Sequence, residues 1–275
     1  MDYIEVSITN FSGFDPEIVM AQLAELGFES FTETEPGIQG FIREDMYREI
    51  SVGAYLKQVC DEHGLQCSFR TIAAQNWNAI WESEYEPVVI AGKCRVRAPF
   101  HAPSDGMPYE IVIEPRMSFG TAHHETTSLM LDLLMTEEVK GKRVLDMGCG
   151  TGVLAILASK MQAAEVVAID NDDWAYSNAI DNMEKNDAPA VTVIRGEAGA
   201  IPRPGYDLII ANINRNVLLN DILVYAGFLK EPGVLLMSGF YEQDLDQIRA
   251  AAENAGLRYA NHKSDNNWVG AKFVK

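Results

Sequence analysis

The chain has 275 residues, enough for two domains, and its 47% hydrophobic content suits a globular protein with a sizeable core. No apolar run approaches the roughly 18 residues of a membrane span, and the acidic start M-D-Y-I-E-V-S lacks the positive charge of a signal peptide. The net charge of −18 opposes direct binding of nucleic acid. We therefore expect a cytoplasmic protein without a membrane or nucleic-acid partner.

The negative charge is concentrated near the N-terminus. Residues 1–87 hold 16 acidic and 4 basic side chains, which is −12 of the total charge. Such a field attracts a basic partner and speeds the encounter with it. Solubility alone is the other interpretation of this charge.

The four cysteines, Cys60, Cys67, Cys94 and Cys149, show neither metal-ligand spacing nor a paired framework. We therefore expect neither disulfides nor a cysteine-bound metal.

The first 73 residues predict a small ferredoxin-like α+β domain. Their elements follow the order β-α-β-β-α-β, which is typical of that fold. The predicted strands are Tyr3–Thr9, 28–33, 37–42 and Gln66–Ile72. One predicted helix begins at Pro16, and the other covers 48–62. Because this fold has no chemistry of its own, we expect it to recognise the substrate through its charge.

A linker helix is predicted over residues 74–87. Trp77, Ile80, Trp81 and Tyr85 recur there at helical spacing, and Pro87 ends the segment. The catalytic domain is then expected to cover 88–275, with strands over 88–96 and 109–114.

The stretch 117–127, M-S-F-G-T-A-H-H-E-T-T, precedes a helix predicted over 128–134. The hydroxyls of Thr126 and Thr127 can either cap that helix or face a cofactor. His123 and His124 are adjacent, so their side chains should diverge. With no third ligand, a metal site is not expected.

The most informative stretch is 144–152, V-L-D-M-G-C-G-T-G, a buried strand followed by a glycine turn and a helix over 153–161. Gly148, Gly150 and Gly152 let a ligand lie against bare backbone. The next strand ends at Asp170, 22 positions beyond Gly148, where an acid typically binds a ribose. A turn that serves only packing would leave Asp170 unexplained.

The remaining elements alternate, which predicts a doubly wound, mostly parallel α/β sheet. Gly148, Asp170 and Asn212 all fall at carboxyl ends of strands, where such sheets bind ligands. The predicted helices are 173–185, 217–229 and 245–255, and the predicted strands are 191–194, 206–211, 234–238, 257–263 and 268–274. Residues 264–267 join the last two strands into an antiparallel hairpin.

The glycine spacing favours one nucleoside cofactor over another. A dinucleotide site usually reads G-x-G-x-x-G, whereas this turn reads G-x-G-x-G. A cofactor without a pyrophosphate needs no phosphate cradle, and a closing hairpin is typical of class I methyltransferases. S-adenosylmethionine is therefore favoured over NAD.

The sequence resembles a known family, the ribosomal protein L11 methyltransferases (PrmA), along its whole length. The glycine turn, Asp170 and Asn212 are typical of class I methyltransferases, and the threonine stretch with the acidic N-terminal domain narrows the resemblance. The family implies S-adenosylmethionine as methyl donor. It implies amines of that ribosomal protein, lysine side chains and the N-terminal α-amine, as acceptors. Its cofactor contacts would fall on Thr127, Gly148, Asp170 and Asn212, with Gly150 and Gly152 shaping the loop.

Two positions depart from related patterns. The family's F-G-T-G-x-H has Ala122 at its second glycine, so the loop is expected to be stiffer or differently bent. After Asn212 the chain reads I-N-R-N in place of the N-P-P-Y used on planar nitrogens, which supports an sp³ amine acceptor. Phe119, His123 and Asn212 are the candidates for the acceptor pocket, and no residue is required as general base.

Other functions remain open from the sequence. The chain can be a class I methyltransferase for another protein or a small amine, a cofactor-binding module without turnover, or an NAD-linked oxidoreductase. The oligomeric state is not predicted.

Overall fold

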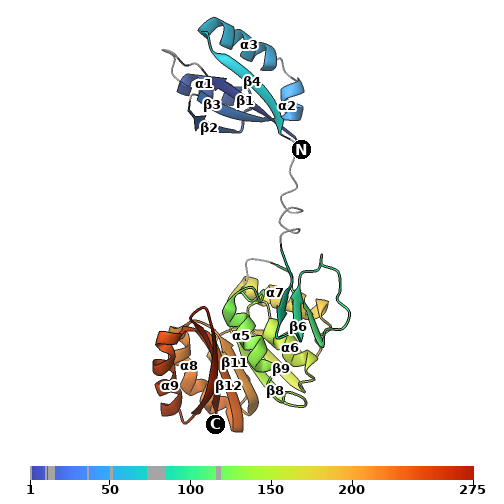
Figure 1. Cartoon of the computed structure of the whole chain (residues 1–275), viewed down its shortest axis with the longest axis vertical. Helices are drawn as coiled ribbons and strands as arrows, with labels where there is room; N and C mark the ends of the chain where they lie inside the picture. Colours follow the sequence, from blue (N-terminus) through green and yellow to red (C-terminus); the bar gives the residue numbers. More distant parts are fainter. Residues whose placement is uncertain are drawn as a thin grey trace. The chain divides into compact units, whose positions relative to one another are not determined.

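The computed structural model describes residues 2–9, 11, 16–35, 37–49, 52–72, 85–115 and 119–275. The chain divides into two compact units, Met1–Glu84 and Tyr85–Lys275 (Figure 1). The linker helix predicted over 74–87 falls largely outside the described residues, and 85–87 are not helical. Within the described ranges, no helix is long and apolar enough to cross a membrane.

The first unit has the predicted ferredoxin-like topology. Its antiparallel sheet has the strand order β2-β3-β1-β4. The apolar side chains of β1 and the stripe of α1 form the core, which includes Ile8, Val19 and Leu23. The elements are β1 (Tyr3–Thr9), α1 (Pro16–Glu25), β2 (Ser30–Thr34), β3 (Gly37–Arg43), α2 (Glu44–Glu49), α3 (Val52–His63) and β4 (Gln66–Ile72).

The single helix predicted over 48–62 is wrong, because the structure has two helices, α2 and α3, in this region. Helix α2 begins at Glu44 and carries Glu44 and Asp45 in its first turn. Acidic side chains there interact favourably with the helix dipole, which supports a start before the predicted one.

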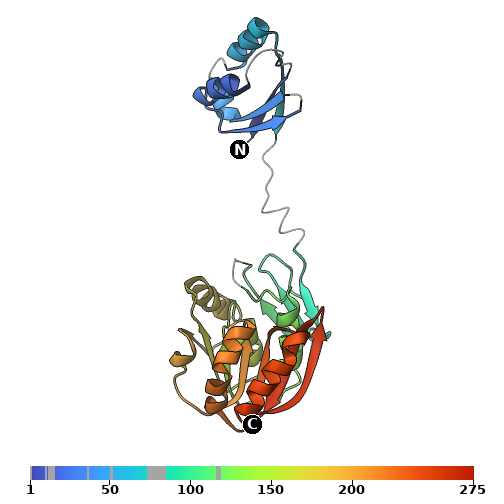
Figure 2. The same cartoon turned by 90° about the vertical axis from the view of Figure 1, so that its left-hand side faces the viewer.

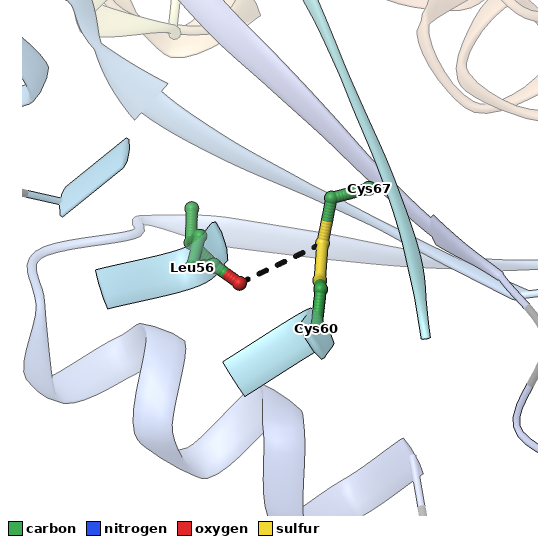
Figure 3. Close-up of a disulfide and its surroundings, with 3 residues drawn as sticks. All are labelled: Leu56, Cys60 and Cys67. Carbon is green, nitrogen blue, oxygen red and sulfur yellow. Dashed lines mark hydrogen bonds between the residues drawn. A yellow bond between two sulfur atoms is a disulfide. The ribbon is translucent and has the colours of Figure 1, made fainter. Parts of the chain in front are cut away.

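The expectation that the cysteines are unpaired is also wrong for two of them. Cys60 in α3 and Cys67 in β4 form a disulfide, with 6.4 Å between their Cα atoms (Figure 3). The sulfur of Cys67 also lies 4.0 Å from the carbonyl oxygen of Leu56. The corner between α3 and β4, which contains Gly64 at positive φ, brings the two cysteines together. Spacing in the sequence does not reveal such a corner.

A three-stranded sheet opens the second unit. It consists of β5 (Val88–Ile90), β6 (Cys94–Arg97) and β7 (Tyr109–Val112). The one strand predicted over 88–96 is therefore two strands. A turn separates them, in which Ala91 and Gly92 adopt positive φ.

The main sheet of this unit has the strand order β10-β9-β8-β11-β12-β14-β13. All neighbouring strands are parallel except those that pair with β14, so the predicted doubly wound sheet with a closing hairpin is confirmed. The strands are β8 (Arg143–Met147), β9 (Glu165–Asp170), β10 (Val191–Arg195), β11 (Tyr206–Asn212), β12 (Leu229–Tyr241), β13 (Arg258–Asp265) and β14 (Trp268–Val274). The helices are α5 (Glu125–Leu134), α6 (Val153–Lys160), α7 (Asp173–Lys185), α8 (Arg215–Phe228) and α9 (Leu245–Asn254), with short 3₁₀ turns at Ala198–Ala200 and Glu242–Asp244.

Helices cover both faces of this sheet (Figures 1 and 2). Leu208 and Ile210 of β11 pack into the core with α5, α6 and α7, whereas Ile209 and Ala211 pack into the core with α8 and α9. A strand buried on both faces reads as a continuous apolar run, as the sequence of β11 does.

The closing hairpin turns within two residues. Asn266 and Asn267 both adopt positive φ, the arrangement of a type I′ turn. The connection is therefore shorter than the predicted 264–267, and Trp268 begins the last strand directly after the turn.

Candidate active site

The glycine turn joins β8 to α6 at the carboxyl edge of the sheet. Gly148, Gly150 and Gly152 adopt φ values of 66°, 54° and 78°, a region that L side chains rarely enter. A Cβ on Gly150 would lie 2.4 Å from the carbonyl oxygen of Phe119, and one on Gly152 would lie 2.3 Å from the side chain of Met183. Gly150 thus permits contact with the loop before α5, and Gly152 permits packing against α7.

Asp170, the last residue of β9, faces this turn. One carboxylate oxygen accepts a hydrogen bond from the Gly150 N–H at 2.8 Å, and the other accepts one from the Asp172 N–H at 3.0 Å. Each carboxylate oxygen can accept two hydrogen bonds. The backbone therefore fixes the carboxylate while leaving it able to accept two hydroxyl donors, as ribose binding requires.

Helix α5 begins at Glu125, three residues before the predicted start, and His124 caps it. Nδ1 of His124 accepts a hydrogen bond from the Thr126 N–H at 3.3 Å. The capping interpretation of the threonines is therefore wrong. Thr126 and Thr127 both lie in the first turn, each only 1% exposed, and face the cavity described below.

Asn212 ends β11 beside these threonines. Its Nδ2 donates a hydrogen bond to Oγ1 of Thr127 at 3.4 Å. Its Oδ1 is buried and accepts no hydrogen bond from any residue that the structure describes. Leaving such an atom unsatisfied costs about 1–3 kcal/mol. A ligand N–H or O–H group could donate the missing hydrogen bond to this oxygen.

These residues line a single cavity of about 1400 Å³ at the carboxyl edge of the sheet. It brings together most of the residues that the sequence predicts for the site, namely Phe119, Thr127, Gly148, Gly150, Asp170 and Asn212. Gly152 and His123 are not part of its lining.

The cavity has a one-sided charge. Its lining, all of it within the described chain, holds four carboxylates and neither lysine nor arginine. The carboxylates belong to Asp170, Asp172, Glu197 and Asp221. Such a site attracts cations and repels phosphates. It therefore suits a sulfonium cofactor and an amine better than a dinucleotide.

A row of aromatic rings, which the sequence did not reveal as a group, lies at one side of the cavity. The ring of His124 lies 5.0 Å from that of Phe119 and 4.9 Å from that of Trp268, and Trp268 lies 4.1 Å from Tyr241. Phe119, His124 and Trp268 line the cavity, and Tyr241 packs against Trp268. We call these four residues the aromatic wall.

His123 points elsewhere. Its Nε2 lies 2.9 Å from the carbonyl oxygen of Glu86, and its ring lies 4.5 Å from that of Tyr85. The expected divergence of the two histidines is confirmed, and His124 lies where we expected His123. Among the described residues, no group of three His, Cys, Asp or Glu side chains could hold a metal ion.

Ala122 adopts φ 67° and is 1% exposed. It therefore takes the left-handed conformation that glycine adopts more readily, at a cost of about 1 kcal/mol. Ser128 then donates a hydrogen bond to the Ala122 carbonyl oxygen at 2.8 Å.

Asp146 of β8 lies beneath the glycine turn and is 1% exposed. One of its oxygens accepts a hydrogen bond from the Ala155 N–H at 3.1 Å, and the other has no partner among the described residues. Burial, together with the charge of Asp170, raises the pKa of Asp146 to about 7. This carboxyl is therefore largely protonated below neutral pH.

Comparisons with known proteins agree with this geometry. The family model for ribosomal protein L11 methyltransferase (PrmA) matches residues 17–275. The ribosomal protein L11 methyltransferase of Phocaeicola vulgatus is 40% identical, over all of this chain and 99% of that protein. The one of Porphyromonas gingivalis is 44% identical, over 94% of this chain and 90% of that protein.

A solved structure shows the same relationship. The ribosomal protein L11 methylase of Lactobacillus delbrueckii subsp. bulgaricus is 26% identical, with a TM-score of 0.64 over 69% of this chain and 98% of that chain. The chain belongs to the ribosomal protein L11 methyltransferase (PrmA) family, and it is an S-adenosylmethionine-dependent methyltransferase.

Proposed function

We propose that this enzyme methylates amines of ribosomal protein L11, the lysine side chains and the N-terminal α-amine, in the cytoplasm. The names of its relatives supply the protein substrate. The observation that supports the amine is the aromatic wall, of which Phe119, His124 and Trp268 line the same cavity as Asn212, a cavity without lysine or arginine in its lining.

The cofactor residues take distinct roles in this proposal. Asp170 accepts hydrogen bonds from the ribose hydroxyls, because its carboxylate is already fixed by two backbone N–H groups. Gly148 lets the methionine portion lie against the backbone, and Thr127 and Asn212 close that end. The unsatisfied Oδ1 of Asn212 accepts a hydrogen bond there. When bound, S-adenosylmethionine supplies an electrophilic methyl group on a sulfonium.

The aromatic wall receives the acceptor amine. The faces of aromatic rings attract a cationic ammonium group, worth about 0.5–2 kcal/mol. Phe119, although 55% exposed, can therefore draw an amine toward His124 and Trp268. The main contribution of the wall is alignment of the amine nitrogen for in-line attack.

The amine must lose its proton before it can react. For a lysine of pKa about 10.4, the neutral form near pH 7.4 costs roughly 4 kcal/mol, and for an α-amine of pKa about 8 it costs under 1 kcal/mol. Desolvation in the cavity lowers the pKa of an amine and reduces this cost, whereas the ring faces favour the ammonium form and act in the opposite direction. We assign no residue as general base, since proton loss to water is sufficient.

The first unit recognises the basic substrate protein in this proposal. Glu29, Glu33 and Glu35 lie along or beside β2, an edge strand of its sheet, and all three are exposed. A basic protein approaching this edge meets several carboxylates at once. Exposed charges are screened beyond about 10 Å at 0.1 M salt, so such docking is salt-sensitive.

The test compares two substrates of one enzyme. Replacing Glu29, Glu33 and Glu35 with glutamine should lower kcat/KM for ribosomal protein L11 about tenfold and leave the methylation of a short lysine peptide unchanged. Added salt should slow the wild type on the protein substrate and affect the triple variant less. Equal rates for wild type and variant on the protein would show that the edge does not dock it.

A further inference from the structure

An ion pair joins the chain segment after Asn212 to the segment that precedes α9. Arg215, the first residue of α8, donates a hydrogen bond from Nη1 to Oδ1 of Asp244 at 2.7 Å. Asp244 is 8% exposed. Neither residue lines the cavity.

Asp244 also bonds to the backbone of Tyr241, the aromatic-wall residue at the end of β12. Its Oδ2 accepts a hydrogen bond from the Tyr241 N–H at 3.3 Å, closing the 3₁₀ turn Glu242–Asp244. The Glu242 N–H donates to the carbonyl oxygen of Asn267 at 2.9 Å, one residue before Trp268. The turn that Asp244 closes is thus bonded to the turn that begins β14.

Arg215 also bonds to Asn216, a residue that lines the cavity. Its Nε and Nη2 donate hydrogen bonds to Oδ1 of Asn216 at 3.2 and 3.1 Å. Asn214, immediately before it, caps α8 by accepting a hydrogen bond from the Val217 N–H at 3.2 Å. Asn214 and Asn216 both line the cavity. The Arg215 guanidinium therefore connects the loop that follows Asn212 with the turn Glu242–Asp244, which is hydrogen-bonded to the backbone of Tyr241 and Asn267.

We propose that Arg215 and Asp244 are a positioning pair that fixes the distance between the Asn212 loop and the aromatic wall, and thereby aligns the acceptor amine. This inference rests on the proposed role of that wall. Neither residue touches substrate or cofactor. Both act through Tyr241 and Trp268 on one side and through Asn214 and Asn216 on the other.

Because Asp244 is buried, the loss of its partner Arg215 should disturb the residues around Asp244 first. A buried carboxylate that loses its cation is left uncompensated, and the surrounding structure must rearrange to hydrate it. The nearest backbone group that it holds is the Tyr241 N–H, so the rearrangement falls first on the residue that packs against Trp268. Ile213 packs against Gly148, but Asn212 keeps its hydrogen bond to Thr127, so the cofactor residues should shift less than Tyr241 and Trp268.

The test uses the full chain with Arg215→Gln, Arg215→Lys and a matched control, Arg249→Gln. Arg249 pairs with Glu253 within α9, where both side chains are about half exposed. In Arg215→Gln, kcat for ribosomal protein L11 should fall about tenfold, with cofactor Kd within twofold of wild type. Arg215→Lys should recover most of that loss, and the control should not differ from wild type.

A second readout requires no methyl transfer. In a chain where Trp77, Trp81 and Trp174 are replaced with phenylalanine, Trp268 is the remaining tryptophan. Arg215→Gln should increase acrylamide quenching of Trp268 fluorescence about twofold, whereas Arg249→Gln should not.

Unchanged quenching of Trp268 in Arg215→Gln would overturn the pair, as would a fall in cofactor affinity that matches the fall in kcat. A wild-type enzyme that leaves ribosomal protein L11 unmodified would refute the proposed function instead. In that case the quenching experiment still decides whether the pair positions the wall.

Discussion

The two sides of the cavity are built differently. On the side that we propose for the cofactor, the glycine turn and Asp170 come from one β-α-β unit, and the Asp170 carboxylate accepts hydrogen bonds from the Gly150 and Asp172 N–H groups. On the acceptor side, the aromatic wall comes from the loop before α5, the end of β12 and the start of β14. Tyr241 and Trp268 meet through the pairing of β12 with β14, and Trp268 meets His124 across a long sequence separation.

This difference separates two tasks. In the proposed function, cofactor binding depends on a local backbone shape that a short sequence can encode. Acceptor choice then depends on side chains that can be exchanged without disturbing that shape. Substitutions on the two sides should therefore have separable effects, on cofactor affinity for one side and on amine turnover for the other.

The largest effect is expected at Asp170. Asp170→Ala removes the proposed ribose acceptor and the hydrogen bond from the Gly150 N–H, so the affinity for S-adenosylmethionine should fall at least tenfold, and about a hundredfold if two charge-assisted hydrogen bonds are lost. Calorimetry measures it. Asp173→Ala is the matched control, since Asp173 is an exposed acid nearby that pairs with Arg195 outside the cavity lining. Tight NAD binding without S-adenosylmethionine binding would contradict the assignment.

A stability effect of about 2 kcal/mol is expected at Asp146. Its pKa is about 7 in the folded chain and lies near 3.8 when unfolded, so the folded state binds the proton more tightly. Its contribution to stability is therefore present at low pH and is lost as pH rises through 7. Between pH 5.5 and pH 8 the wild type should lose about 2 kcal/mol relative to Asp146→Asn, which has no such titration.

Thermal unfolding of the two proteins at pH 5.5 and pH 8 measures this difference. The gap in Tm should widen in favour of Asp146→Asn at the higher pH by several degrees. A gap that is the same at both pH values would show that Asp146 does not titrate in this range.

On the acceptor side, Trp268→Ala should lower kcat/KM for ribosomal protein L11 about tenfold, because the amine loses one ring face of about 0.5–2 kcal/mol and its alignment. Cofactor Kd should change less than threefold. Trp174, which is 79% exposed, also lines the cavity. Trp174→Ala is the control, because it removes an aromatic ring that is not part of the aromatic wall. If Trp268→Ala weakens cofactor binding as much as turnover, the two sides are not separable.

The smallest effects distinguish the two histidines. His124→Ala should slow methylation a few-fold, because it removes a ring of the wall and the cap of α5. His123→Ala should leave the rate within twofold, since its ring faces Tyr85 and Glu86. Steady-state rates with both variants measure this, and a larger loss for His123 would reverse the assignment.

The features of the site that could be predicted from the sequence are the local ones. The glycine turn, Asp170 and Asn212 could be predicted, because strand ends and glycine spacing are local and parallel strands bring their carboxyl ends to one edge. The fold of both units followed from the order of their elements in the same way.

Trp268 and Tyr241 could not be assigned to the site, because the register of β14 against β12 brings Tyr241 to Trp268, and only the folded chain brings Trp268 to His124. The choice of His124 over His123 depended on where α5 begins, a boundary that differs by three residues from the predicted one. The pairing of Cys60 with Cys67 depended on the corner between α3 and β4. Each of these follows from tertiary geometry that leaves no periodic pattern.

The most direct test of the central claim is mass spectrometry of purified ribosomal proteins after incubation with the enzyme and isotope-labelled S-adenosylmethionine. We predict labelled methyl groups on lysine side chains and on the N-terminal α-amine of ribosomal protein L11, and about tenfold less label with Trp268→Ala at short reaction times. Label on another protein or on RNA, with ribosomal protein L11 unmodified, would contradict the account.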